Sequence, residues 1–261
     1  MLSLIERHYN KHKEDLRLQR RHGIVEFQVS MHYIRQYLNS LGNKSDIKIL
    51  DVGAGTGRYT IELKNEGYDI EAVELVQHNI DVMRKNDPDV RVRKGDARDL
   101  SFISDETYDM VILFGPLYHL PLEEDKVKAL SEAKRVAKRG GLVLVAYLMN
   151  DYSILTYCFA ENRMAKLMEN GFVDENFHVR TPEGELYDYV RIEDIDRLNG
   201  KVGLERQMIF SPEGAADFMR TQLNYMTDEN FELFIKYQIQ MSARPEVVGA
   251  GSHVVDVVKK C

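Results

Sequence analysis

Apolar strand patterns alternate with helical patterns through the first 150 residues, and no other feature of the sequence constrains the fold as strongly. Strands are expected at residues 47–52, 70–75, 90–93, 108–114 and 142–147. The runs at 47–52 and 108–114 are almost wholly apolar, as parallel strands buried on both faces are. This alternation predicts an α/β fold with a doubly wound, Rossmann-like parallel sheet.

The segments between these strands have helical patterns. Helices are expected at residues 26–41, 58–65, 77–84 and 123–138. In the last of these, apolar residues recur at Val127, Leu130, Ala133 and Val136, which is the spacing of one helix face.

The regular alternation of strand and helix patterns ends near residue 150. Helices are expected at 152–170 and 215–242, and strands at 206–210 and 253–259. The last two strands are expected at an antiparallel C-terminal edge of the mostly parallel sheet, with a helical cap. The expected domains are an N-terminal helical lid (1–44), a Rossmann-like core (45–150) and a helical substrate cap that carries the last two strands (151–261).

A glycine-rich turn follows the first strand and contains Gly53, Gly55 and Gly57. Glycines let the backbone approach a ligand closely, and the following helix offers unpaired N–H groups. A dinucleotide fingerprint would need a third glycine where Arg58 stands, so an NAD-dependent dehydrogenase is disfavoured. G-x-G-x-G with Asp51 two residues before it is the spacing seen with S-adenosylmethionine.

Two further acids follow strands of the same sheet. Glu74 ends the second strand, where a carboxylate can accept both hydroxyls of a ribose. Asp96 follows the third strand, where it can accept the exocyclic amine of adenine, while the Ala97 N–H reaches a ring nitrogen. Either acid alone is also compatible with an ordinary solvated turn.

Because the glycine-rich turn and the two acids follow the first three strands in this order, the chain resembles a class I S-adenosylmethionine-dependent methyltransferase. The matching segments are KILDVGAGTGRYT (48–60), EAVEL (71–75), KGDARDL (94–100), YDMVILFGPLYHL (108–120) and EAKRVAKRGGLVLVAY (132–147). The resemblance implies that the glycine loop holds the methionine part of the cofactor and that Phe114 and Gly115 line the floor near the sulfonium. The cofactor-binding residues that it implies are Asp51, Gly53, Ala54, Gly55, Gly57, Arg58, Glu74, Leu75, Gly95, Asp96, Ala97, Phe114 and Gly115.

Candidate catalytic residues lie in the loop after the fourth strand. Methyl transfer from a sulfonium needs alignment and exclusion of water, and it needs a base only when the acceptor is protonated. His119 has a suitable unperturbed pKa for that role, with a packing or capping histidine as the alternative. Tyr118 can present its ring to the cationic donor.

The same loop disfavours some acceptors. It reads Phe114-Gly115-Pro116-Leu117 rather than the (Asp/Asn)-Pro-Pro-(Tyr/Phe) pattern associated with methylation of planar amino groups. It also lacks a cysteine for thiolate chemistry on cytosine. The two cysteines of the chain, Cys158 and Cys261, are too few for a zinc cage.

Residues 1–40 are locally basic in a chain whose formal net charge is −7. Arg17, Arg20 and Arg21 are candidate substrate residues on a lid that pairs with a carboxylate, with a solvated helix face as the alternative. Tyr225 is a candidate aromatic of the substrate cap.

These features favour a methyltransferase that acts on an O, N or C atom of a small molecule and forms S-adenosylhomocysteine. The alternatives are an RNA- or protein-modifying methyltransferase, a non-catalytic S-adenosylmethionine-binding protein, and aminopropyl transfer on the same fold. The acidic balance makes nucleic acid an unlikely partner. The longest uncharged run, 110–122, is too short and too broken by proline to span a membrane, and a cytoplasmic protein is expected.

Overall fold

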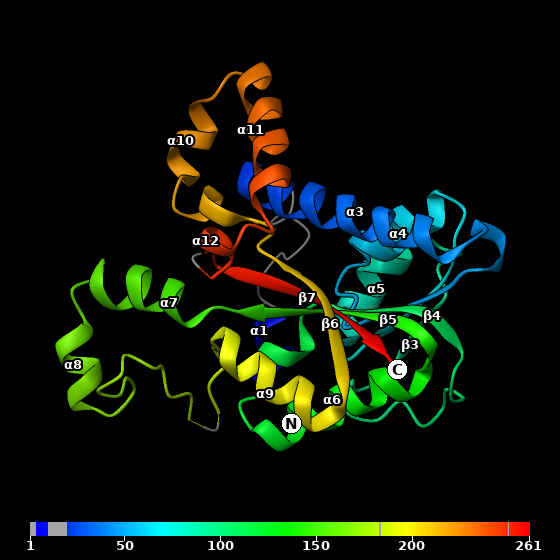
Figure 1. Ribbon diagram of the computed structural model, residues 1–261, viewed down its shortest axis with the longest axis horizontal. Helices are drawn as coiled ribbons and strands as arrows, with labels where there is room; N and C mark the ends of the chain where they lie inside the picture. Colours follow the sequence, from blue (N-terminus) through cyan, green and yellow to red (C-terminus); the bar gives the residue numbers. More distant parts are fainter. Residues whose placement is uncertain (1–3, 10–19, 183, 250) are drawn as a thin grey trace.

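The computed structural model describes residues 4–9, 20–182, 184–249 and 251–261 (Figure 1). Within them a seven-stranded sheet has the order β3-β2-β1-β4-β5-β7-β6. Its strands are β1 (Lys48–Val52), β2 (Asp69–Glu74), β3 (Val92–Lys94), β4 (Tyr108–Leu113), β5 (Ala137–Leu148), β6 (Leu204–Phe210) and β7 (His253–Lys260). This is a Rossmann-like sheet, and the predicted fold class is confirmed.

The first five strands run parallel, with β1 between β2 and β4. Every residue of β1 after Lys48 is buried, as the near-continuous apolar run predicts. β5 begins at Ala137, earlier than its pattern indicates, because Ala137 pairs with Tyr108 before the register shifts. The preceding helix therefore ends at Val136.

β7 is antiparallel to both β5 and β6. Its pairing sets His253 opposite Leu148, so the start of β7 lies at the edge of the sheet where the parallel strands end. β6 is the outermost strand, and the antiparallel strand lies one place in from the edge.

Helices cover both faces of the sheet (Figure 1). The longer ones are α3 (Arg21–Leu41), α4 (Arg58–Asn65), α5 (Gln77–Asn86), α6 (Glu123–Val136), α9 (Ile192–Val202) and α11 (Asp228–Met241). On one face, α3 and α4 pack with α11 and with α10 (Arg220–Tyr225) around a core that includes Ile34 and Leu63. On the other face, α6 and α9 pack around Leu130 and Leu198.

Three helical segments differ from their sequence patterns. α3 begins at Arg21, five residues earlier than expected, because His22 and Val25 are already buried. The range 152–170 is not one helix but α7 (Asn150–Ser153), a π-helix at Ile154–Phe159 and α8 (Met164–Glu169). The sequence pattern assigns no element to α9, whose capping box joins Arg191 and Asp194.

A buried ion pair joins the two last strands. Asp256 lies in the middle of β7 and is fully buried. Its carboxylate accepts hydrogen bonds from Arg206 Nε and from Asn199 Nδ2, each at 2.6 Å. Removing one partner of a buried pair leaves the other charge uncompensated, which costs more than the pair contributes.

We expect Arg206→Met to lower the free energy of unfolding by about 3 kcal/mol, because Asp256 would remain buried without its cation. Urea denaturation followed by circular dichroism measures the change. Arg244→Met is the control, since Arg244 and its partner Glu246 are both more than half exposed, and it should change stability by at most about 1 kcal/mol. Equal effects of the two variants would show that the Asp256 pair does not hold this edge.

Candidate active site

One cavity lies along the edge of the sheet where the parallel strands end. Of the predicted cofactor residues, those that line it are Asp51, Gly53, Ala54, Gly55, Arg58, Glu74, Leu75, Gly95, Asp96, Ala97, Phe114 and Gly115. Gly57 does not line it; this residue is the N-cap of α4. The structure therefore brings together residues from loops after β1, β2, β3 and β4.

The glycine loop after β1 packs closely against the loop after β4. Gly53 has a φ of 74°, and a Cβ there would lie 2.5 Å from Pro116 Cγ. The Gly53 N–H donates to Val73 O at 2.7 Å, which fixes the turn against β2. Only glycine fits this backbone conformation and this approach.

Glu74, at the end of β2, organises the middle of the cavity. The side chain is buried, and its Oε2 accepts from Gly55 N at 2.7 Å while Oε1 accepts from Val76 N at 2.8 Å and from Asn79 Nδ2 at 3.3 Å. Burial raises the pKa of Glu74, and these hydrogen bonds oppose the rise. A carboxylate has about four acceptor positions, so Glu74 retains capacity for a ligand hydroxyl.

Asp51 lies beneath the glycine loop and is 1% exposed. Its Oδ2 accepts a hydrogen bond from Thr60 Oγ1 at 2.6 Å. Burial raises the pKa of Asp51 to about 7, the Thr60 hydrogen bond opposes the rise, and the charge of Glu74 adds to it. A carboxyl group in this position changes charge near neutral pH.

The raised pKa of Asp51 predicts a pH dependence of stability. The folded chain keeps a proton up to about pH 7 that the unfolded chain releases near pH 4, so the free energy of unfolding falls as the pH rises between these values. Asp51→Asn should remove the decrease in the free energy of unfolding that Asp51 causes. The variant should therefore be more stable than the native chain at about pH 8. Denaturation of the ligand-free protein across this range measures it. The exposed Asp46→Asn is the control, and an unchanged slope in Asp51→Asn would show that Asp51 is ionised throughout.

Asp96 lines the cavity but is already paired. Its Oδ2 accepts from Arg98 Nη2 at 2.7 Å, and Arg98 Nη1 donates to Asp125 Oδ2 at 2.7 Å. Although burial opposes it, the Arg98 hydrogen bonds hold the pKa of Asp96 below its usual range. Asp96 is therefore a charged hydrogen-bond acceptor in the part of the cavity that the loop after β3 lines.

Aromatic rings form the wall beside the glycine loop. Phe114 packs edge-on against Tyr59, with ring centroids 5.2 Å apart. The Arg58 guanidinium lies over the Phe27 ring at 4.3 Å, which holds this cation at the cavity.

Tyr118 and His119 both line the cavity, but the two ring nitrogens of His119 are engaged. Nδ1 lies 2.8 Å from Leu186 O, and because a carbonyl only accepts, Nδ1 is the donor. In the neutral ring Nε2 then accepts from Tyr9 OH at 2.9 Å. This geometry favours the packing alternative for His119 over the proton-accepting one.

The predicted N-terminal lid divides into two parts. α1 (Leu4–Tyr9) lies at the cavity, which Ile5 and Tyr9 line. α3 packs in the core with α10 and α11, and its Glu26 and Ser30 also line the cavity. The lid over residues 1–44 stays a prediction, and α1 and α3 are the parts of this range that line the cavity.

Of the candidate substrate residues that the structure describes, none lines the cavity. Arg21 donates to Met226 O at 2.7 Å, pairs with Asp228 at 2.6 Å and lies over the Phe231 ring. Arg20 is exposed and lines no part of the cavity, and Tyr225 is 85% exposed. Arg17 lies outside the described residues. We therefore do not place Arg20, Arg21 or Tyr225 at the cavity, and Arg17 stays a prediction.

Sequence reasoning missed several residues that line the cavity. They are Ile5, Tyr9, Glu26, Ser30, Thr56, Tyr59, Val76, Asn79, Arg98, Pro116, Leu120, Ala146, Pro212, His253 and Val255. The position of Ala146 near the end of a predicted strand was a usable signal. Glu26 and His253 carry no motif, and only the packing of α3 and the direction of β7 bring them here.

Comparisons with known proteins identify a methyltransferase domain in this chain. Residues 50–145 match the family described as "Methyltransferase domain". A demethylmenaquinone methyltransferase of Lysinibacillus sphaericus is 29% identical over 128 residues, which are 47% of this chain and 53% of that protein. The chain thus spans about half the length of the curated relatives it matches.

Solved structures share the fold over most of the chain. A protein of Thermotoga maritima, described as a possible histamine N-methyltransferase, superposes with a TM-score of 0.57 at 20% identity and covers 98% of this chain and 97% of its own. The magnesium protoporphyrin IX methyltransferase of Synechocystis, crystallised with S-adenosylhomocysteine, has a TM-score of 0.57 at 14% identity and covers 91% and 84%. At these sequence identities the comparison shows that the proteins share a fold.

Residues 50–145 therefore match a methyltransferase domain, as the motifs predict, and the sheet has the fold of solved S-adenosylmethionine-dependent methyltransferases. Among the described residues, no helix combines the length and apolar character needed to cross a membrane.

Proposed function

We propose that this protein transfers a methyl group from S-adenosylmethionine to a small-molecule acceptor. The observation that carries the proposal is a single cavity that joins the glycine loop and Glu74 to the side chains of Tyr118 and His253. A cofactor along the first part would direct its methyl group toward the second. The cover that α1 contributes supports a small acceptor rather than a macromolecule.

The residues of the cavity fit the cofactor. A Cβ at Gly55 would meet nothing within 4 Å, so the loop backbone is open for close approach of a ligand. Glu74 would accept from the ribose hydroxyls, Asp96 from the adenine amine, and the Arg58 guanidinium would pair with the carboxylate of the methionine part.

The bound cofactor supplies an activated methyl group. The protein therefore mainly has to align the acceptor with that group and to exclude water from the site. Phe114 and Tyr59 form an apolar wall that excludes water. Glu74 fixes the glycine loop through Gly55 N, which holds the loop in one position during the reaction. Ile5 and Tyr9 cover the cavity from α1.

Glu74→Gln should weaken binding of S-adenosylhomocysteine by about 10- to 100-fold, because hydrogen bonds to an ionised acceptor contribute about 1.5–3 kcal/mol. Isothermal titration calorimetry measures the affinity. Glu71→Gln is the matched control, since Glu71 lies on the same strand and does not line the cavity. Unchanged affinity in Glu74→Gln, or binding of NAD in place of S-adenosylhomocysteine, would contradict the proposal.

Tyr9→Phe should speed the dissociation of S-adenosylhomocysteine by about fivefold, because the hydrogen bond to His119 Nε2 that holds α1 at the cavity contributes about 1 kcal/mol. Surface plasmon resonance measures the rate. Tyr237→Phe, at an exposed tyrosine of α11, is the control. If both variants release the ligand at the native rate, α1 does not act as a cover.

A further inference from the structure

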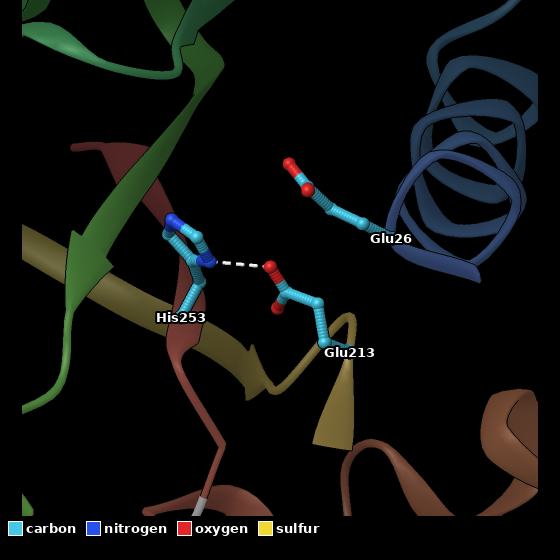
Figure 2. Close-up of side chains that lie close together, drawn as sticks. All are labelled: Glu26, Glu213 and His253. Atoms are coloured by element: carbon cyan, nitrogen blue, oxygen red, sulfur yellow. Dashed lines mark hydrogen bonds and ion pairs between the residues drawn. The ribbon is translucent and has the colours of Figure 1, made fainter. Parts of the chain in front are cut away.

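The two ends of the cavity each have an acidic side chain paired with a basic one. At the end that we propose for the acceptor, Glu213 Oε1 is bonded to His253 Nδ1, and a carboxylate oxygen of Glu26 lies within 4.8 Å of both side chains (Figure 2). At the end lined by the loop after β3, Asp96 is paired with Arg98. Because β2, β1, β4 and β5 lie between β3 and β7, the two pairs face different parts of a bound ligand.

Arg98 binds the carboxylate of Asp96 through three of its N–H groups. The backbone N–H of Arg98 donates to Asp96 Oδ1 at 2.9 Å, and Nη2 donates to Oδ2 at 2.7 Å. Nε lies between the two oxygens, 3.1 Å from Oδ1 and 3.2 Å from Oδ2. A planar guanidinium that donates through two nitrogens fixes the plane of a carboxylate as well as its position.

These hydrogen bonds limit what Asp96 can do for a ligand. An ionised carboxylate has about four acceptor positions, and the three N–H groups of Arg98 occupy all but about one of them. Although burial opposes it, the same hydrogen bonds hold the pKa of Asp96 below its usual range. Asp96 therefore stays ionised at neutral pH and can accept one further hydrogen, but it cannot donate one.

Arg98 is itself held by a core helix. Its Nη1 donates to Asp125 Oδ2 at 2.7 Å, and Lys128 Nζ donates to Asp125 Oδ1 at 3.0 Å. Asp125 lies in the first turn of α6, which buries Leu130 in the core. The series Asp96–Arg98–Asp125 therefore joins the loop after β3 to α6.

We infer that Arg98 is a positioning residue for the base of the cofactor: it holds Asp96 as a group that only accepts, so that the site binds a 6-amino purine and rejects a 6-oxo purine. The inference rests on the proposed function, because it concerns the adenine part of S-adenosylmethionine in the same cavity. The open position of Asp96 accepts from the 6-amino group, and the Ala97 N–H donates to the ring nitrogen N1. Leu75 and Ala97 line the cavity and give the ring apolar contact.

A 6-oxo purine reverses the hydrogen-bonding pattern of this edge of the base. Its carbonyl oxygen would face the Asp96 carboxylate, which places two acceptors together, and its N1–H would face the Ala97 N–H, which places two donors together. Polar groups that a ligand covers without pairing them cost more than a lost contact, so such a site discriminates strongly. If Asp96 could take a proton, its O–H would donate to the carbonyl oxygen and the first mismatch would disappear. Arg98 prevents this.

The affinities for S-adenosylhomocysteine and S-inosylhomocysteine test the inference, because the two ligands differ only at this edge of the base. Isothermal titration calorimetry near neutral pH first measures S-adenosylhomocysteine, and a failure to bind would contradict the proposed function itself. We expect the native protein to bind S-inosylhomocysteine about 100-fold or more weakly. Equal binding of the two ligands would overturn the inference and leave the proposed function standing.

Arg98→Met tests the role of the arginine. We expect it to weaken binding of S-adenosylhomocysteine by about tenfold or more and to leave that of S-inosylhomocysteine nearly unchanged, because Asp96 becomes free to rotate and to take a proton. A purely structural loss would weaken both ligands alike, so the ratio of the two affinities separates the two explanations. Asp125→Asn should reduce the ratio by a smaller factor, about threefold, since Arg98 keeps its hydrogen bonds to Asp96.

Arg163→Met is the matched control. Arg163 also pairs with an acid two residues before it, Glu161 at 3.1 Å, but neither residue lines the cavity, so both affinities should stay at the native values. Circular dichroism checks that Arg98→Met is folded, and Asp125→Asn supplies the same ratio if it is not. The inference is overturned if Arg98→Met weakens both ligands by the same factor or leaves the affinity for S-adenosylhomocysteine unchanged, or if Asp125→Asn, used in its place, leaves the ratio at the native value.

Discussion

Strand direction determines where most residues of the cavity lie. In a parallel sheet all carboxyl ends meet at one edge, and here the loops after β1, β2, β3 and β4 meet around one cavity. β7 runs the other way, so its first residue, His253, reaches the same edge, and Glu213 follows the end of β6 there (Figure 1). A reversed direction of β7 would remove His253 from the site.

The same edge gathers buried carboxylates, and each is stabilised differently. Glu74 accepts backbone N–H groups, Asp51 accepts a threonine hydroxyl, and Glu213 is paired with a histidine. Burial raises the pKa of all three. Such groups cluster where ligands with complementary charge bind. A sulfonium group has that charge.

Much of the fold and the cofactor site follows from local sequence. The five parallel strands were predicted from apolar runs, and α4 was predicted at both ends because a glycine loop precedes it and Gly67 follows. Most of the predicted cofactor residues line the cavity because they lie at the carboxyl ends of strands or in the loops that follow. Gly57 is the exception, since it caps a helix instead.

The acceptor site was not predictable in the same way. Glu26, Glu213 and His253 are far apart in the sequence, and their meeting depends on the packing of α3 and on the insertion of β7 between β5 and β6. Arg21 has the pattern of a substrate-binding arginine in the sequence, but its partners Asp228 and Phe231 lie on α11, about 200 residues further along the chain. Long-range packing, which local patterns do not encode, decides both cases.

A crystal structure of the protein with S-adenosylhomocysteine tests the central claim most directly. The account predicts that the ribose lies against Glu74, that the homocysteine part follows the glycine loop toward Phe114, and that the sulfur faces the space between Tyr118 and His253. A ligand bound with its ribose away from Glu74, or with its sulfur turned from His253, would contradict it.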